Sequence, residues 1–164
     1  MRSYNDINGK YQGGDLYLND CNLSSLATMP SEIIGSVECE YNKLTNLVGG
    51  PQHVTGDYRC GNNQLTDLVG CASHIGGRMV FWNNNITSLV GIHKIIKSCS
   101  SIRFDSNKIT QGGIGLLLIE NLTSMTTDYL PFVIIESYLG KGTKGMMACR
   151  SELIEKGYEN HAKL

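Results

Sequence analysis

Three side chains of the kinds that bind metal ions recur at one constant spacing in this chain. They are Glu32, His53 and His74, which follow one another at equal intervals. If each interval is one turn of a coil, successive side chains lie about 5 Å apart, close enough to share a zinc-type ion. Such a site also needs a further ligand and supporting hydrogen bonds, and the sequence offers neither. We therefore expect the three residues to decorate a solvated turn, with a metal-dependent enzyme as the alternative.

A second pair, Cys149 and His161, has the residue types of a thiol nucleophile and its general base. No third residue that would orient the histidine accompanies them, and a buried structural cysteine on a helix is the commoner case. Glycine pairs such as Gly49 and Gly50 do not precede a helix in a phosphate-binding pattern. The sequence therefore predicts a protein with no catalytic residue and no cofactor.

The spacing of the metal-type residues belongs to a repeat. Four ungapped segments of equal length begin at Asp15, Ser36, Asp57 and Arg78, and a fifth begins at Ser100 after a short insertion. Self-similarity at a fixed period of this length predicts a solenoid, in which each repeat packs only on its neighbours. A solenoid offers a broad surface and no enclosed cleft.

Each repeat carries an apolar residue, a variable residue, a second apolar residue, two variable residues, an Asn or Cys, a variable residue and an aliphatic residue. We expect the two apolar positions to face inward: Leu16, Leu18, Val37, Cys39, Tyr58, Cys60, Met79, Phe81, Ile102 and Phe104. The Asn or Cys positions are Cys21, Asn42, Asn63, Asn84 and Asn107.

This pattern resembles the leucine-rich-repeat family over residues 15 to about 112. The resemblance implies an α/β repeat, a short leucine-rich-repeat solenoid of period 21 with a parallel β-sheet and turn asparagines bonded to the backbone. Gly residues with Pro30 and Pro51 interrupt the remainder of each repeat. They exclude full helices there, so we expect 3-10 turns or extended segments on the convex side.

The two ends depart from the repeat. Residues 1–14 are expected to form an N-terminal cap over the first strand, and the period is lost from Gln111 onward. Residues 113–164 are predicted to form a helical C-terminal cap on the repeats at 15–112. One helix is expected to be capped by Thr127 or Asp128, with Pro131 early and Gly140 at its end. The residues expected to face inward from the two cap helices are Leu130, Val133, Ile134, Tyr138, Met147, Leu153, Ile154 and Tyr158.

The outward columns of the strands are the best candidate for a binding surface. They contain the only tryptophan, with tyrosine, arginine and acidic residues around it, which is the composition of a protein-binding hot spot. The predicted partner-binding residues are Tyr17, Glu38, Glu40, Tyr41, Arg59, Arg78, Trp82, Arg103 and Asp105. In the alternative interpretation, Trp82 packs on Tyr41 or Arg103 and shields the sheet. Val80 is expected to be exposed in the same ladder as Arg59 and Arg103.

Composition narrows the possible partners and compartment. The net charge of -1 gives no field that recruits nucleic acid, and no apolar run is long enough to span a membrane. The N-terminus lacks the apolar region of a signal peptide, so we expect a cytoplasmic protein. A disulfide between the stacked Cys39 and Cys60 is sterically conceivable, but a reducing compartment favours two separate thiols.

A more particular resemblance comes from three stretches: CGNNQLTDLVG from Cys60, IIESYLGKG from Ile134 and CRSELIEKGYENHAKL from Cys149. They are similar to small accessory proteins of tailed bacteriophages of the T-even kind. The resemblance implies a host bacterial cytoplasm and a host bacterial protein as partner. It favours a non-enzymatic interaction module that inhibits a host defence or toxin enzyme. A virion or assembly component is a further alternative.

Overall fold

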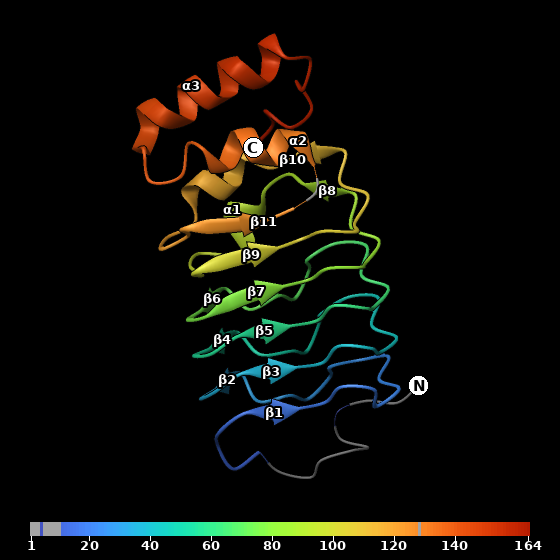
Figure 1. Ribbon diagram of the computed structural model, residues 1–164. Coiled ribbons are helices and arrows are strands. Elements are labelled where there is room, and N and C mark those ends of the chain that lie inside the picture. The colour runs from blue at the N-terminus through green and yellow to red at the C-terminus, as the bar shows by residue number, and fades with distance from the viewer. Residues whose placement is uncertain (1–3, 5–10, 128) are drawn as a thin grey trace.

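The computed structural model describes residues 4, 11–127 and 129–164. The chain winds into a parallel β-solenoid of about 5 turns with a period of about 21 residues, and helices follow at the C-terminal end (Figure 1). The predicted solenoid, its period, its parallel sheet and its C-terminal helices are therefore confirmed. Of the predicted N-terminal cap, residues 1–3 and 5–10 lie outside the described residues.

One face of the coil is a six-stranded parallel sheet. Its strands, in spatial order, are β1 (Leu16–Tyr17), β3 (Val37–Glu38), β5 (Tyr58–Arg59), β7 (Arg78–Val80), β9 (Ser101–Arg103) and β11 (Ser124–Thr126). Leu16 pairs with Val37 and Val37 with Tyr58, one repeat period each time, whereas the step from Met79 to its partner Ile102 is longer. The difference is the insertion expected before the fifth repeat, and the register absorbs it without a slip.

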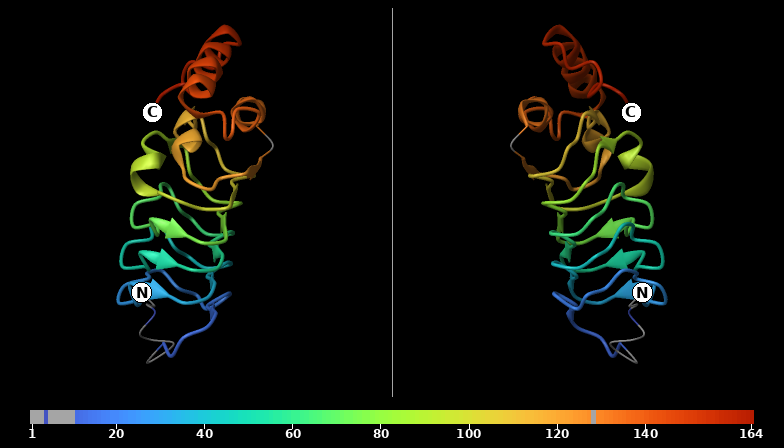
Figure 2. Two further views of the ribbon diagram at one scale, coloured as in Figure 1. Left: turned by 90° about the vertical axis from the view of Figure 1, so that its left-hand side faces the viewer. Right: turned by 90° about the vertical axis from the view of Figure 1, so that its right-hand side faces the viewer.

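The other sides of the coil carry strands of two residues each. A three-stranded parallel sheet contains β2 (Glu32–Ile33), β4 (His53–Val54) and β6 (His74–Ile75), and β8 (Ser88–Leu89) pairs with β10 (Gln111–Gly112). The short helix α1 (Ile92–Ile95) follows β8. Figure 2 shows the three-stranded sheet on a separate side of the coil from the six-stranded sheet. The extended segments expected there are thus organised as hydrogen-bonded ladders.

The core fills the space between these sheets. All ten residues predicted to face inward are buried, and Leu18, Val37, Cys39, Tyr58, Cys60, Met79 and Phe81 have no exposed surface. The rings of Tyr58 and Phe81 meet edge to face with centroids 5.7 Å apart, and Phe104 follows Phe81 at 6.4 Å. An aromatic column therefore runs through the middle turns and joins them by packing.

Buried asparagines join each turn to the one before it. Asn63 accepts a hydrogen bond from the Leu44 N–H through Oδ1, and its Nδ2 donates to the carbonyls of Cys39, Cys60 and Gly61. Equivalent bonds link Asn42, Asn84 and Asn107 to the backbone of the preceding turn. The predicted backbone bonding of the turn asparagines is confirmed, and it satisfies amide and carbonyl groups that would otherwise be buried without partners.

Cys39 and Cys60 lie side by side across β3 and β5, the pair at which the sequence favoured separate thiols over a disulfide. The strands pair in register one repeat period apart, so the two Cα atoms lie 5.0 Å from each other. That separation is inside the range that a disulfide spans. The register therefore brings the two cysteines within disulfide range, and the preference for separate thiols stays a prediction.

The parallel sheet extends further than the sequence suggested. Met125 of β11 pairs with Ile102 at the same longer step that joins Ile102 to Met79, so the repeat continues beyond Gln111 to Thr126. The segment between them contains a 3-10 helix, η2 (Ile114–Leu118), with Leu116 fully buried. One more turn of solenoid therefore lies inside the region assigned to the helical cap.

Two helices close the C-terminal end, α2 (Leu130–Glu136) and α3 (Gly142–Glu155). Pro131 lies in the first turn of α2 as predicted, while Asp128 falls outside the described residues. The expected inward faces are partly wrong, because Leu130, Val133, Met147 and Ile154 are exposed. Ile134 and Leu153 are buried as predicted, together with Phe132, Ile135 and Cys149. No helix in the described part of the chain is long and apolar enough to cross a membrane.

Replacing Asn63 by Ala tests the role of the asparagine ladder. The change leaves the buried Leu44 N–H without its partner and removes three hydrogen bonds to carbonyl groups. We therefore expect the free energy of unfolding to fall by about 1–3 kcal/mol in urea denaturation. Gln64→Ala, at the exposed neighbouring position, is the control and should change it by less than about 0.5 kcal/mol. Equal denaturation midpoints for the two variants would contradict the ladder.

Candidate binding face

The register brings the three metal-type residues into one column, as predicted. Glu32 pairs with His53 and His53 with His74, and the two imidazole rings stack with centroids 4.7 Å apart. The three side chains are exposed, and His74 Nδ1 lies 2.9 Å from the Ser73 hydroxyl. Across the described residues, no three His, Cys, Asp or Glu side chains gather closely enough to hold a metal ion. The predicted column of Glu32, His53 and His74 is therefore present, but its geometry gives no support to a metal-dependent enzyme.

Cys149 and His161 are each held in other contacts. Cys149 is fully buried on α3, and burial raises the pKa of its thiol to about 11, with the Glu152 carboxylate as a smaller cause. His161 packs edge to face on Phe132, and its Nδ1 lies 3.0 Å from the Gly112 carbonyl oxygen. A thiol with a raised pKa stays protonated near neutral pH and is a poor nucleophile. The two residues are therefore parts of the cap, in which His161 ties the C-terminal tail to β10.

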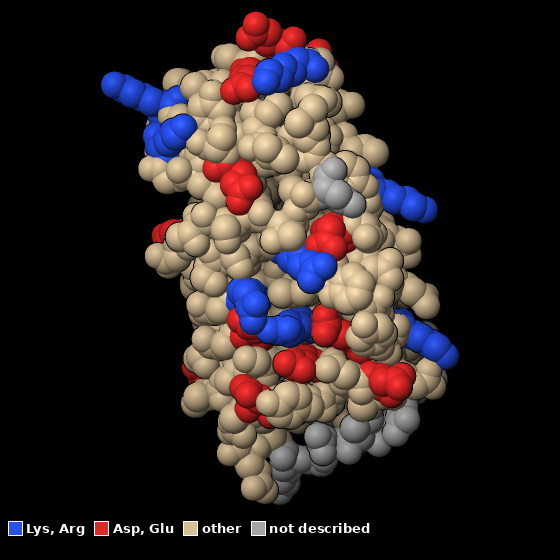
Figure 3. Space-filling view, viewed as in Figure 1, with Lys and Arg blue, Asp and Glu red and all other residues tan. Residues whose placement is uncertain are grey.

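The nine predicted partner-binding residues lie on the strands of the six-stranded sheet or directly after them. Tyr17 and Tyr41 are 64% and 56% exposed at one end of the face. In the middle of the same face, Lys and Arg atoms gather with Asp and Glu atoms on both sides of them (Figure 3). The face therefore combines exposed aromatic rings with a mosaic of both charges.

Trp82 lies down on the sheet. Its indole Nε1 donates a 3.0 Å hydrogen bond to Glu40, two strands away, and its ring meets that of Tyr41 edge to face with centroids 6.3 Å apart. The Arg103 guanidinium sits 5.3 Å from the ring centroid on the other side. Trp82 thus packs on both Tyr41 and Arg103, where the alternative interpretation expected one or the other, and the indole is half-buried. These contacts do not decide between partner binding and shielding of the sheet.

Gly61, which follows the intervening strand β5, makes this arrangement possible. A Cβ atom at this position would lie 2.6 Å from Trp82 Cδ1, so any side chain would occupy the space of the indole. The glycine is one repeat before Trp82 and one after Glu40, in the same outward column. This column therefore holds a fixed aromatic platform rather than a free side chain.

A carboxylate at the start of β5 organises the basic residues. Asp57 Oδ2 lies 2.8 Å from Arg59 Nη2 and 2.9 Å from Arg78 Nη2, and Oδ1 accepts a 2.8 Å bond from the Arg78 backbone N–H. Burial alone would raise the pKa of Asp57, but the bonds from Arg78 and Arg59 outweigh it and hold that pKa below its ordinary value of 3.8.

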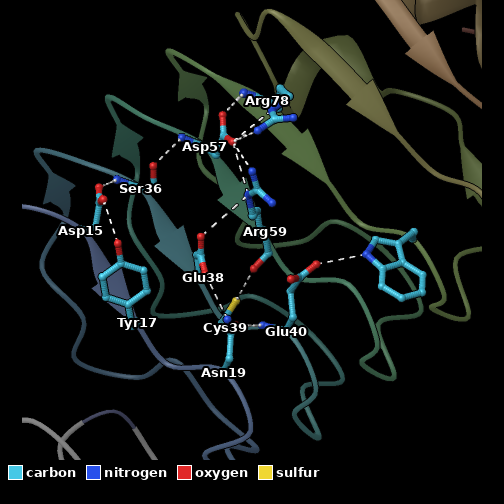
Figure 4. A network of polar contacts seen from close by, with 11 residues as sticks. Asp15, Tyr17, Asn19, Ser36, Glu38, Cys39, Glu40, Asp57, Arg59 and Arg78 are labelled. Atoms are coloured by element: carbon cyan, nitrogen blue, oxygen red, sulfur yellow. Dashed lines mark hydrogen bonds and ion pairs between the residues drawn. The ribbon is translucent and has the colours of Figure 1, made fainter.

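This carboxylate belongs to a ladder that the sequence analysis missed. Asp15 Oδ1 accepts the Ser36 N–H at 2.7 Å, and Ser36 Oγ accepts the Asp57 N–H at 3.1 Å (Figure 4). Asp15, Ser36, Asp57 and Arg78 are the first residues of the four ungapped repeats. The column was visible in the alignment, and the signal was a short polar acceptor at the start of three successive strands.

Val80 does not project from the face as expected. It is only 8% exposed, because the neighbouring strands carry the long side chains of Arg59 and Arg103. A shallow hollow of about 230 Å³ lies over it. Arg103 itself is fixed by Asp105, with Nε 2.6 Å from Oδ1 and Nη2 3.0 Å from Oδ2. The face thus contains a shallow hollow lined by arginine side chains beside the Trp82 platform.

No protein-family model, curated protein or solved structure matches this chain.

Replacing Gly61 by Ala tests the packing of the Trp82 indole over Gly61. The new methyl group displaces the indole, so we expect the tryptophan emission to move to longer wavelength as the ring becomes exposed. Overpacking at this site is expected to lower the free energy of unfolding by about 1–3 kcal/mol. Glu32→Ala, on the three-stranded sheet, is the control and should leave the emission unchanged. An emission spectrum that Gly61→Ala does not alter would refute the proposed packing.

Asp57 gives a pH-dependent prediction. Because its pKa is lowered in the folded protein, its ionised carboxylate stabilises the fold above pH 3.8, and this contribution disappears as the pH falls through the folded-state pKa. We therefore expect Asp57→Asn to be less stable than the wild type at about pH 6, with the difference shrinking below about pH 3.8. Thermal unfolding at a series of pH values measures it. A difference that is constant with pH would show that the carboxylate charge is unimportant.

Proposed function

We propose that this chain is a non-enzymatic protein-binding module that uses the exposed face of the six-stranded sheet. The observation that carries the proposal is the Trp82 platform: a half-buried indole held in place by Glu40, Tyr41 and Arg103. A ring already fixed in one orientation loses little conformational entropy when a partner covers it. Aromatic residues with arginine beside them are also the side chains that contribute most to protein interfaces.

The charges of the face favour a folded protein over nucleic acid as partner. Arg59, Arg78 and Arg103 alternate with Asp57 and Asp105, and each arginine is ion-paired to one of these carboxylates. A polyanionic backbone needs an extended basic surface, whereas a protein can present a complementary mosaic. The mixed pattern therefore supports a partner with both charges on its surface.

The biological context of the proposal rests on resemblance. The repeat pattern resembles leucine-rich repeats, and the stretches from Cys60, Ile134 and Cys149 are similar to accessory proteins of T-even-like phages. On that basis the partner is a host bacterial protein, met in the host cytoplasm. The favoured role is inhibition of a host defence or toxin enzyme.

The first experiment is affinity capture from a bacterial lysate with wild-type and Trp82→Ala chains as paired baits. A genuine partner of the face is recovered by the wild type and depleted with the variant. Proteins recovered equally by both baits bind elsewhere on the chain.

For the captured partner, we expect Trp82→Ala to weaken binding by about 2 kcal/mol, roughly 30-fold, in calorimetric titration. The double variant His53→Ala, His74→Ala changes exposed residues on the three-stranded sheet and is the matched control with unchanged affinity. Should Trp82→Ala bind normally while the histidine variant fails, the working surface is the other sheet.

A further inference from the structure

The hollow over Val80 has arginines from three neighbouring strands around it. Arg59 comes from β5, Arg78 from β7 and Arg103 from β9, and Ser101 and Thr126 complete the rim. The floor is the nearly buried side chain of Val80. Three cationic groups thus surround a small apolar base within about 230 Å³.

The neighbouring carboxylates fix the guanidinium groups and leave part of each one free for a ligand. The ion pairs with Asp57 and Asp105 use Nε and Nη2 of Arg59, Arg78 and Arg103. A guanidinium carries five N–H donors, so these bonds do not exhaust any of the three. Because the arginines are already held in place, a ligand that accepts the remaining donors needs little reordering of the site.

The size and the surroundings of the hollow select a single anionic group. Glu38 lies 4.0 Å from Arg59, and Glu40 and Asp105 hold the two sides of the Trp82–Arg103 contact. These carboxylates repel a ligand with many charges, such as a nucleic-acid backbone. One carboxylate can still meet the arginines, and the apolar floor strengthens its attraction by excluding water.

We propose that the hollow binds the carboxylate of one aspartate or glutamate of the partner protein, next to the Trp82 platform. The inference rests on the proposed function, because it specifies what the partner presents to the same face. Arg103 contacts both the ring of Trp82 and the hollow. The partner segment therefore carries an acidic residue beside an apolar or aromatic residue that covers the indole.

The test uses the full chain and three blocked tripeptides, acetyl-Ala-Glu-Ala-amide and its glutaminyl and phosphoseryl counterparts. Binding is followed by NMR shifts of the arginine Nε–H groups and by the fluorescence of Trp82, the only tryptophan. We expect the glutamyl peptide to give saturable shifts that weaken at higher salt, and the glutaminyl peptide to give none.

Arg78→Gln is the test variant, because its side chain is 57% exposed and Asp57 keeps its bond to Arg59. We expect it to weaken glutamyl-peptide binding about tenfold. Arg150→Gln, on the exposed surface of α3, is the matched control with unchanged binding. Equal shifts with the glutaminyl peptide, or equal binding by both variants, would overturn the proposal. Saturation by the phosphoseryl peptide alone would overturn the carboxylate assignment.

These outcomes are separate from those of the proposed function. The peptide titration needs no natural partner, so it can fail while Trp82→Ala still weakens capture of a partner. In that case the face binds a protein but the hollow is not a carboxylate site. If Trp82→Ala leaves partner binding unchanged, the proposed function itself fails.

Discussion

The rest of the structure depends on the hydrogen bonds of the buried turn asparagines. Each amide side chain reaches carbonyls in its own turn and in the preceding one, as Asn84 does with Phe81 and Cys60. A slip of one residue would turn the apolar column outward and leave these groups unpaired. The ladder therefore fixes the register of the coil, and residues at equal positions of successive repeats become neighbours.

Both the interior and the exposed face follow from this register. Inside, it brings Cys39 and Cys60 within disulfide range and places the rings of Tyr58, Phe81 and Phe104 in one column of aromatic contacts. Outside, it places Gly61 between Glu40 and Trp82. Because Gly61 has no side chain, the indole of Trp82 can lie over it and donate a hydrogen bond to the Glu40 carboxylate. The Trp82 platform is thus built from three residues that are one repeat apart in the sequence and adjacent in space.

The inward half of the fold could be predicted from the sequence because it depends on one repeating rule. An apolar residue in the strand faces the core, and an asparagine at the turn makes hydrogen bonds to backbone N–H and carbonyl groups. The arrangement of the outward side chains depends on the relative sizes of side chains on adjacent strands. The burial of Val80 and the orientation of Trp82 could therefore be seen only in the three-dimensional structure. The last strand, β11, was missed because no turn asparagine follows Met125. The helix faces were mistaken because packing on η2, not the pattern of α2 and α3 alone, selects which side is buried.

We propose that the face around Trp82, which the register holds in place, is the recognition surface of this protein. Hydroxyl-radical footprinting of the chain, alone and bound to its captured partner, tests it directly, because reactive side chains lie on every side of the coil. We expect the partner to slow oxidation of Tyr41 and Trp82 on the six-stranded sheet. His53 and His74 on the three-stranded sheet and Met147 on α3 should oxidise at unchanged rates. Protection of the histidines or of Met147, with Tyr41 and Trp82 unaffected, would show that the partner binds another surface of the protein.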